Sequence, residues 1–196
     1  MKKIVPKDAV LIPDNAKHVF KGQIFDVYQW EQKEFDNSSL IYEMLKRPDT
    51  VNAICIANGK VLVIEDIQPH VGLRLSFPGG KVDREDEGTL KAIQRELKEE
   101  AGYEFKNWRL VKVNQPHPKL EWFVYHYLAW DGEKVSEPQL GSGEKISLKL
   151  VLLEELKTLA LNKAGYLGES IDLVKDLNNL EEAVNLPEFE GKEVDR

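Results

Sequence analysis

The chain has 196 residues, of which 42% are apolar, and this is enough to bury one sizeable core. With 34 acidic and 27 basic residues the formal charge is −7, and no run of Lys or Arg is long enough to follow a nucleic-acid backbone. No window approaches the roughly 18 consecutive apolar residues that a membrane-spanning helix needs. These features argue against nucleic acid and against a membrane as partners.

The single cysteine, Cys55, lies in an apolar run and can form no intramolecular disulfide, which fits a reducing compartment. We therefore expect a cytoplasmic protein. We expect the chain to consist of an N-terminal strand extension over residues 1–46, a main domain over 47–180 and an acidic tail over 181–196. The tail either packs or is disordered, and its composition favours disorder.

Hydrophobic periodicity and turn signals predict strands and helices in an irregular order. The expected strands are 23–30, 39–45, 51–57, 60–64, 108–113, 122–130 and 146–152, and the expected helices are 89–101, 153–161 and 169–177. Asn58-Gly59 suits the positive φ angles of a type I′ hairpin turn between two of these strands. The order argues for an α/β fold of the α+β type, in which helices cover a mixed sheet, and against a doubly wound parallel sheet.

The predicted helix at 89–101 has an apolar stripe and an acidic flank. Thr89 can serve as N-cap, and Gly102 can adopt the left-handed conformation that ends a helix. The apolar stripe, which would face the core, consists of Leu90, Ile93, Leu97 and Ala101. At about 100° per residue, Glu96, Glu99 and Glu100 share an arc of about 100° beside that stripe.

Like charges this close together call for a compensating cation, and carboxylate oxygens are ligands that suit Mg²⁺, with Mn²⁺ as a second choice. The alternative is a solvated acidic helix face, whose charge Lys91, Arg95 and Lys98 would offset.

A glycine-rich loop precedes the helix, and together they resemble the Nudix box. Pro78-Gly79-Gly80 lets the backbone approach a ligand without obstruction by Cβ atoms. The box ends in Arg-Glu, an apolar residue, any residue, Glu-Glu, any residue and Gly, and residues 95–102, RELKEEAG, fill every defined position. The spacing departs at one point, because six residues instead of five separate Gly80 from Glu87. Either the loop carries an insertion or Asp86 takes the role of the first Glu, which is to orient Arg95.

The resemblance implies a Nudix-like α/β/α sandwich and metal-dependent hydrolysis of a pyrophosphate bond. It assigns Glu96 and Glu100 as the main metal ligands, with Glu99 adjoining them and the Gly79 carbonyl completing the site. Metal ions there would neutralise the diphosphate and activate a water molecule.

The catalytic set implied by the resemblance is Glu99, Arg95 and a Glu on a late loop. Glu144 aligns best with that loop position, and Glu137 is the fallback. The implied substrate contacts are Gly80, Phe25, Gln68 and Pro118.

Two features resemble the ADP-ribose and nucleotide-sugar pyrophosphatases of the family. Pro118 stands fifteen residues after Tyr103, and residues 18–28 resemble an N-terminal stretch that commonly builds a homodimer and part of the nucleotide pocket. Two departures concern the substrate: Asp66-Ile67-Gln68 stands where Gln-x-Arg is frequent, and Ser76 stands where a Glu is frequent.

Four aromatic residues have two interpretations. Phe25, Tyr28, Trp30 and Trp122 either stack on a base or form core. The substrate alternatives are a nucleoside diphosphate derivative, a nucleoside triphosphate, or a nucleotide that is bound as a signal without being cleaved.

Overall fold

The computed structural model describes residues 2–68, 72–139, 146–162 and 168–195. The chain divides into two compact units. The smaller comprises residues 1–50, 113–124 and 190–196, and the larger comprises residues 51–112 and 125–189. None of the helices in the described ranges has the length and apolar content needed to cross a membrane.

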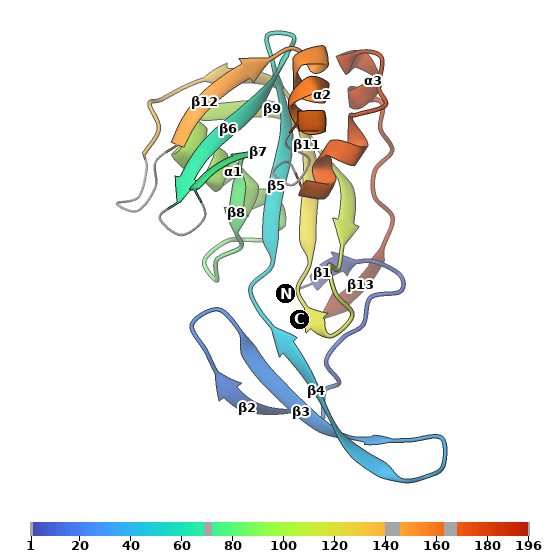
Figure 1. Cartoon of the computed structure of the whole chain (residues 1–196). Coiled ribbons are helices and arrows are strands. Elements are labelled where there is room, and N and C mark those ends of the chain that lie inside the picture. The colour runs from blue at the N-terminus through green and yellow to red at the C-terminus, as the bar shows by residue number, and fades with distance from the viewer. Residues whose placement is uncertain (1, 69–71, 140–145, 163–167, 196) are drawn as a thin grey trace. The chain divides into compact units, whose positions relative to one another are not determined.

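The larger unit is built on a sheet with the strand order β12-β6-β5-β11-β9, to which β7 and β8 add at β6 and β5 (Figure 1). The strands are β5 (Thr50–Ala57), β6 (Lys60–Gln68), β7 (Gly72–Ser76), β8 (Gly79–Lys81), β9 (Tyr103–Asn114), β11 (Val124–Lys134) and β12 (Ile146–Val151). The predicted hairpin turn is confirmed, because Asn58 and Gly59 have φ angles of 52° and 70° between the antiparallel strands β5 and β6.

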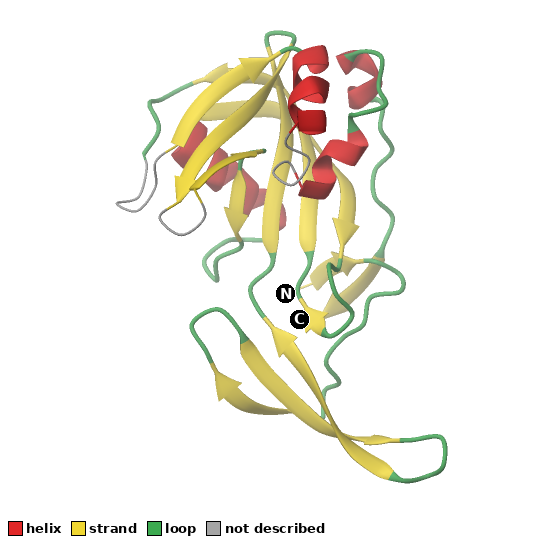
Figure 2. Cartoon of the chain, in the orientation of Figure 1, coloured by secondary structure: helices red, strands yellow, loops and turns green. Residues whose placement is uncertain are grey.

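Helices cover this sheet on both faces, as expected for an α/β/α sandwich. Helix α2 (Leu153–Asn162), the 3-10 helix η1 (Gly168–Leu173) and α3 (Leu180–Val184) contribute Leu156, Ile171 and Ala183 to a buried cluster with Ile54 and Val63 of the sheet. Helix α1 (Thr89–Ala101) contributes no residue to that cluster, and Figure 2 shows it on the other side of the sheet. The predicted mixed α/β architecture is therefore confirmed.

The smaller unit carries the predicted N-terminal strands. Its sheet has the order β10-β4-β3-β2, formed by β2 (Lys17–Lys21), β3 (Asp26–Lys33), β4 (Ser39–Lys46) and β10 (Leu120–Glu121). Met44 of β4 is 1% exposed. In the same unit, the buried Asp49 accepts hydrogen bonds from Lys3 Nζ at 2.7 Å and from the Phe123 N–H at 3.0 Å, which satisfies a carboxylate that burial would otherwise penalise.

Described parts of the acidic tail form regular structure, so the expectation of disorder is wrong for them. Strand β13 (Lys192–Asp195) pairs antiparallel with β1 (Lys2–Val5), in register from Lys2 with Asp195 to Val5 with Lys192. Its partner strand lies almost the whole chain length away, so composition alone could not reveal the pairing. In the larger unit, Arg109 Nη1 also donates to the carbonyls of Val184 and Leu186, at 2.6 and 2.7 Å.

The predicted helix at 169–177 is a 3-10 helix that ends at Leu173, and a buried polar network holds it. His126 Nδ1 lies 2.6 Å from Ser170 Oγ, which donates to Asn52 Oδ1 at 2.8 Å. Because the single hydroxyl proton of Ser170 goes to Asn52, the network assigns the histidine proton to Nδ1. Burial, together with the charge of Lys112, lowers the pKa of His126 from 6.5 to about 4.

This lowered pKa makes His126 a source of acid sensitivity. The folded state resists protonation, so His126 favours folding above pH 6.5, and that contribution is lost as the pH falls from 6.5 to 4. The loss amounts to roughly 3 kcal/mol for a shift of this size. We expect His126→Gln to flatten the fall in unfolding free energy across this window, measured by urea denaturation.

The matched control for this experiment is His117→Gln, because His117 is exposed. It should keep the wild-type pH profile. If the unfolding free energy of His126→Gln fell with pH as steeply as that of the wild-type protein, the lowered pKa of His126 would be contradicted.

Candidate active site

The Pro78-Gly79-Gly80 loop is pressed against strand β5. The carbonyl of Pro78 accepts a hydrogen bond from the Ala53 N–H at 3.0 Å, and Gly79 adopts a φ of 152°. A Cβ atom on Gly79 would lie 2.1 Å from the Val51 carbonyl oxygen and 2.6 Å from Asn52 Cα, so no side chain fits there. The glycine fixes how closely the loop approaches the sheet.

The same loop contacts the acidic flank of α1. A Cβ atom on Gly80 would lie 2.5 to 2.7 Å from the carboxylate atoms of Glu96, so the bare backbone makes room for that carboxylate. The Gly79 N–H donates to Glu100 Oε2 at 2.9 Å. The structure thus brings together four residues expected from the box, namely Gly79, Gly80, Glu96 and Glu100.

Helix α1 begins and ends close to its predicted limits. Gly102 is in the left-handed region, with a φ of 67°, and its N–H donates to the Lys98 carbonyl, which confirms the predicted end. At the start, Gly88 takes the N-cap position and Thr89 is the first helical residue. The hydroxyl of Thr89 lies 2.7 Å from the Tyr127 hydroxyl, so it bonds across to β11 instead of capping.

The predicted core stripe of α1 is confirmed for Ile93, Leu97 and Ala101, all fully buried. Leu90 was wrongly predicted to be core, because it is 38% exposed and Ala92 is buried instead. The buried face of the first turn is therefore rotated toward Ala92.

Arg95 ties the loop before the helix to the acidic flank. Its guanidinium binds Asp86 in a bidentate manner, with Nε to Oδ1 at 3.0 Å and Nη2 to Oδ2 at 2.9 Å. Nη2 also donates to the Lys81 carbonyl at 3.1 Å. Nη1 donates to Glu96 Oε1 at 2.9 Å and to Glu99 Oε2 at 3.2 Å. A planar fork of donors suits such simultaneous contacts, which one ammonium group could not reproduce.

The structure decides between the two carboxylates that could orient Arg95. Asp86 is buried, and its hydrogen bonds from Arg95 lower its pKa. Glu87 is exposed and makes no hydrogen bond or ion pair with any described residue. Asp86 therefore takes the position of the first acidic residue of the box, and the extra loop residue places Glu87 outside the network.

The three carboxylates among the predicted metal ligands differ in exposure. The Glu96 side chain is 15% exposed, and burial raises its pKa although the neighbouring Arg95 opposes the shift. The Glu99 side chain is 48% exposed, and Glu100 is half-buried. A divalent cation would offset the cost of burying these carboxylates beside one another.

The chemistry of this donor set fits a hard divalent cation, since it offers several carboxylates and a cradle without Cβ atoms. Within the described residues no three acidic, His or Cys side chains converge on one point. Arg95 occupies one oxygen each of Glu96 and Glu99, and the Gly79 N–H occupies one oxygen of Glu100. Metal ligation would therefore use the remaining lone pairs or exchange these bonds.

The other predicted residues belong to segments outside the glycine loop and α1. Phe25 and Pro118 belong to the smaller unit, where Phe25 is 37% exposed and Pro118 is exposed. Gln68 is the last residue of β6, opposite Gly72 of β7. Glu144 lies outside the described residues. The fallback residue Glu137 is exposed and forms an ion pair with Lys134 at 2.8 Å.

Sequence reasoning missed Arg47, which lies between two of the aromatic candidates in the smaller unit. Its guanidinium carbon is 4.5 Å from the centre of the Trp122 ring and 5.7 Å from that of Phe25. Its Nε is buried and has no hydrogen-bond partner in the described part of the chain. The available signal was a cation directly before Pro48, one residue after the strand that ends at Lys46.

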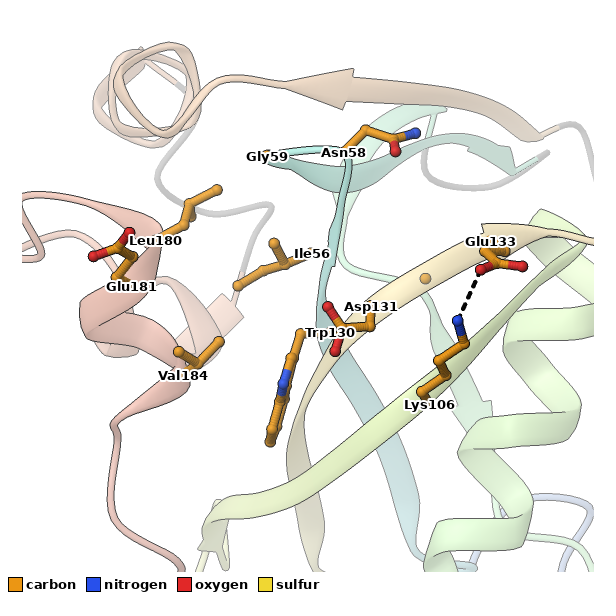
Figure 3. Close-up of a pocket in the computed structure, with 11 residues that line it drawn as sticks. Ile56, Asn58, Gly59, Lys106, Trp130, Asp131, Glu133, Leu180, Glu181 and Val184 are labelled. Atoms are coloured by element: carbon orange, nitrogen blue, oxygen red, sulfur yellow. Dashed lines mark hydrogen bonds and ion pairs between the residues drawn. The ribbon is translucent and has the colours of Figure 1, made fainter.

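The larger unit also has an open cavity of about 580 Å³, and the residues that line it are not those of the box (Figure 3). Ile56, Trp130, Leu180 and Val184 form its apolar part, and the Lys106–Glu133 ion pair lies at its rim. Its lining includes no residue of α1 or of the glycine loop. The volume of this cavity is therefore no argument that it is the active site.

A family model described as the NUDIX domain matches residues 46–171, which is more than half of the chain. The chain belongs to the Nudix family. It is thus a Nudix hydrolase, and enzymes of this family generally use divalent metals. The match includes the glycine loop and the whole of α1, so the Arg95 network lies within the Nudix box.

A solved structure supports the Nudix fold independently. The chain is similar to a protein whose structure is described as "Crystal structure of ADP compounds hydrolase", with a TM-score of 0.62 and 21% identity, over 82% of this chain and 85% of that one. At this identity the likeness shows the fold alone. No curated protein matches the sequence.

The Asp86–Arg95 pair gives a direct test of which carboxylate serves the Nudix box. Asp86→Asn removes the charge of a buried, bidentate partner, so we expect a loss of about 2 kcal/mol in unfolding free energy, measured by urea denaturation. Glu87→Gln is the matched control and should stay within about 0.5 kcal/mol of the wild-type protein. If Glu87→Gln cost as much as Asp86→Asn, the assignment of Asp86 would be wrong.

Proposed function

We propose that the chain hydrolyses the pyrophosphate bond of a nucleoside diphosphate derivative, with ADP-ribose or a nucleotide sugar as substrate and Mg²⁺, or Mn²⁺, as cofactor. The products would be a nucleoside monophosphate and a phosphorylated sugar. The observation that carries the proposal is the contact of Glu96 and Glu100 with the glycine loop, beside an Arg95 held by Asp86. This arrangement presents several carboxylates where a diphosphate-bound cation can be held.

Each box residue has a distinct role in this proposal. Glu96, Glu99, Glu100 and the Gly79 carbonyl would hold the metal, which when bound neutralises the diphosphate and makes water a better nucleophile. Gly80 is a proposed substrate contact, and its lack of a Cβ atom leaves room for the Glu96 carboxylate. Arg95 positions Glu96 and Glu99 through its hydrogen bonds. Glu144 is proposed to position the attacking water.

The smaller unit is proposed to recognise the base and to form a homodimer. Arg47 between Phe25 and Trp122 offers a planar cation and two aromatic rings, a combination on which a base can stack. Pro118 and Gln68 remain proposed substrate contacts.

Exposed apolar side chains on the sheet of the smaller unit, among them Phe20 at 60%, Leu40 at 60% and Ile41 at 69%, support burial against a second copy. A cytoplasmic location fits the buried free thiol of Cys55.

The similar protein of known structure is named an ADP compounds hydrolase, which also favours a diphosphate derivative over a triphosphate. The test is incubation with ADP-ribose, nucleotide sugars, dinucleoside polyphosphates and nucleoside triphosphates in Mg²⁺, with the products identified by chromatography. We expect nucleoside monophosphate from ADP-ribose or a nucleotide sugar, and a decrease of at least about 100-fold in rate for Glu100→Gln.

The control for this test is Glu87→Gln, which should keep the wild-type rate because its side chain is exposed and outside the network. If only nucleoside triphosphates were cleaved, with release of inorganic pyrophosphate, triphosphates would be the substrate class instead of diphosphate derivatives. Tight binding of a nucleotide without any cleavage would instead favour a nucleotide sensor.

A further inference from the structure

A second groove runs along the side of α1 that is not used by the acidic flank. It has a volume of about 390 Å³ and is open to solvent between α1 and the first residues of β9, both labelled in Figure 1. Its lining consists of Lys91, Gln94, Arg95, Lys98, Tyr103, Glu104, Phe105 and Trp108. The volume falls in the range that binds small organic ligands.

One wall of the groove is the basic flank of the helix. Lys91, Gln94 and Lys98 recur at i, i+3 and i+7, so their side chains project on the same side of α1. Lys91 is exposed and makes no ion pair with any described residue. Lys98 pairs with Glu104 at 2.8 Å, but both side chains are more than half exposed, so the pair is weak and can open for a stronger anion.

The positive charge that this groove offers a ligand comes from the two lysines and not from Arg95, and Glu104 in the lining offsets part of it. The donors of Arg95 are already used by Asp86, Glu96, Glu99 and the Lys81 carbonyl. In a chain with a net charge of −7, two lysines beside a concave surface mark it as a place for an anionic ligand.

The opposite wall is aromatic and rigid. Trp108 Nε1 donates to the Phe105 carbonyl at 3.0 Å, and the Trp108 ring meets Phe105 and Tyr127 edge-on at 6.0 and 6.2 Å. Tyr103 stacks on Phe105 with the ring centres 6.1 Å apart. Tyr103 and Trp108 are only half-buried, so they offer π surface that is already ordered before a ligand arrives.

We propose that this groove binds a nucleoside phosphate, with the base against Tyr103 and Trp108 and the phosphate between Lys91 and Lys98. Gln94 lies between the two lysines and offers an amide for the base edge or the phosphate. The site is a binding site only, without bond cleavage. It shares Arg95 but no metal-ligating carboxylate with the Nudix box, and binding here does not rest on the proposed hydrolysis.

The experiment is a calorimetric titration of AMP into the full-length chain in EDTA, which removes metal-dependent binding at the box. We expect saturable binding that weakens at least tenfold in the double variant Lys91→Gln/Lys98→Gln. A matched double variant with the same charge change, Lys17→Gln/Lys60→Gln, should bind within twofold of the wild-type protein. Glu100→Gln should also bind normally.

Several outcomes would overturn the proposal. These are no saturable binding by the wild-type chain, equal affinities for the groove variant and the wild-type protein, or equal weakening in the control double variant. Inorganic phosphate that binds as tightly as AMP would also contradict it, because the aromatic wall would then contribute nothing. Tyr103→Ala is expected to weaken AMP binding while leaving the affinity for inorganic phosphate unchanged.

Discussion

The bidentate bond between Asp86 and Arg95 is the interaction on which the arrangement of the site depends. It joins the loop before α1 to the helix, and the remaining donors of the same guanidinium hold Glu96, Glu99 and the Lys81 carbonyl. A single side chain therefore sets the distance between the glycine loop and the acidic flank. Because Asp86 is buried and charged, losing this bond would leave its carboxylate with the hydrogen bond from the Asp83 N–H, at 2.8 Å, as its remaining partner among the described residues.

The two glycines of the loop, Gly79 and Gly80, also fix the position of the loop relative to α1. Gly79 lies against the backbone of β5, and Gly80 lies against the carboxylate of Glu96, so the loop is confined between sheet and helix. Arg95 lies between two different flanks of α1. It donates to the carboxylates on one side and lines the lysine-containing groove on the other. The helix thus separates an acidic surface suited to a cation from a basic surface suited to an anion.

Local patterns in the sequence predicted the local parts of this structure. The Asn58-Gly59 turn, the end of α1 at Gly102 and the burial of Ile93 and Leu97 follow from backbone preferences and helical periodicity. The choice of Asp86 over Glu87 could not be predicted, since it depends on the path of a loop with one extra residue. The pairing of β1 with β13 joins opposite ends of the chain, and the Arg47 cluster joins three distant segments, so neither leaves a periodic signal.

The central claim is that the glycine loop and the Arg95-held carboxylates form a divalent-metal site, and Mn²⁺ binding followed by electron paramagnetic resonance tests it most directly. The account predicts that Glu96→Gln and Gly80→Ala each weaken Mn²⁺ binding at least tenfold, whereas Glu87→Gln binds as the wild-type chain does. In Gly80→Ala the added methyl group would displace the Glu96 carboxylate. Unchanged Mn²⁺ binding in Glu96→Gln, or an equal loss in Glu87→Gln, would contradict it.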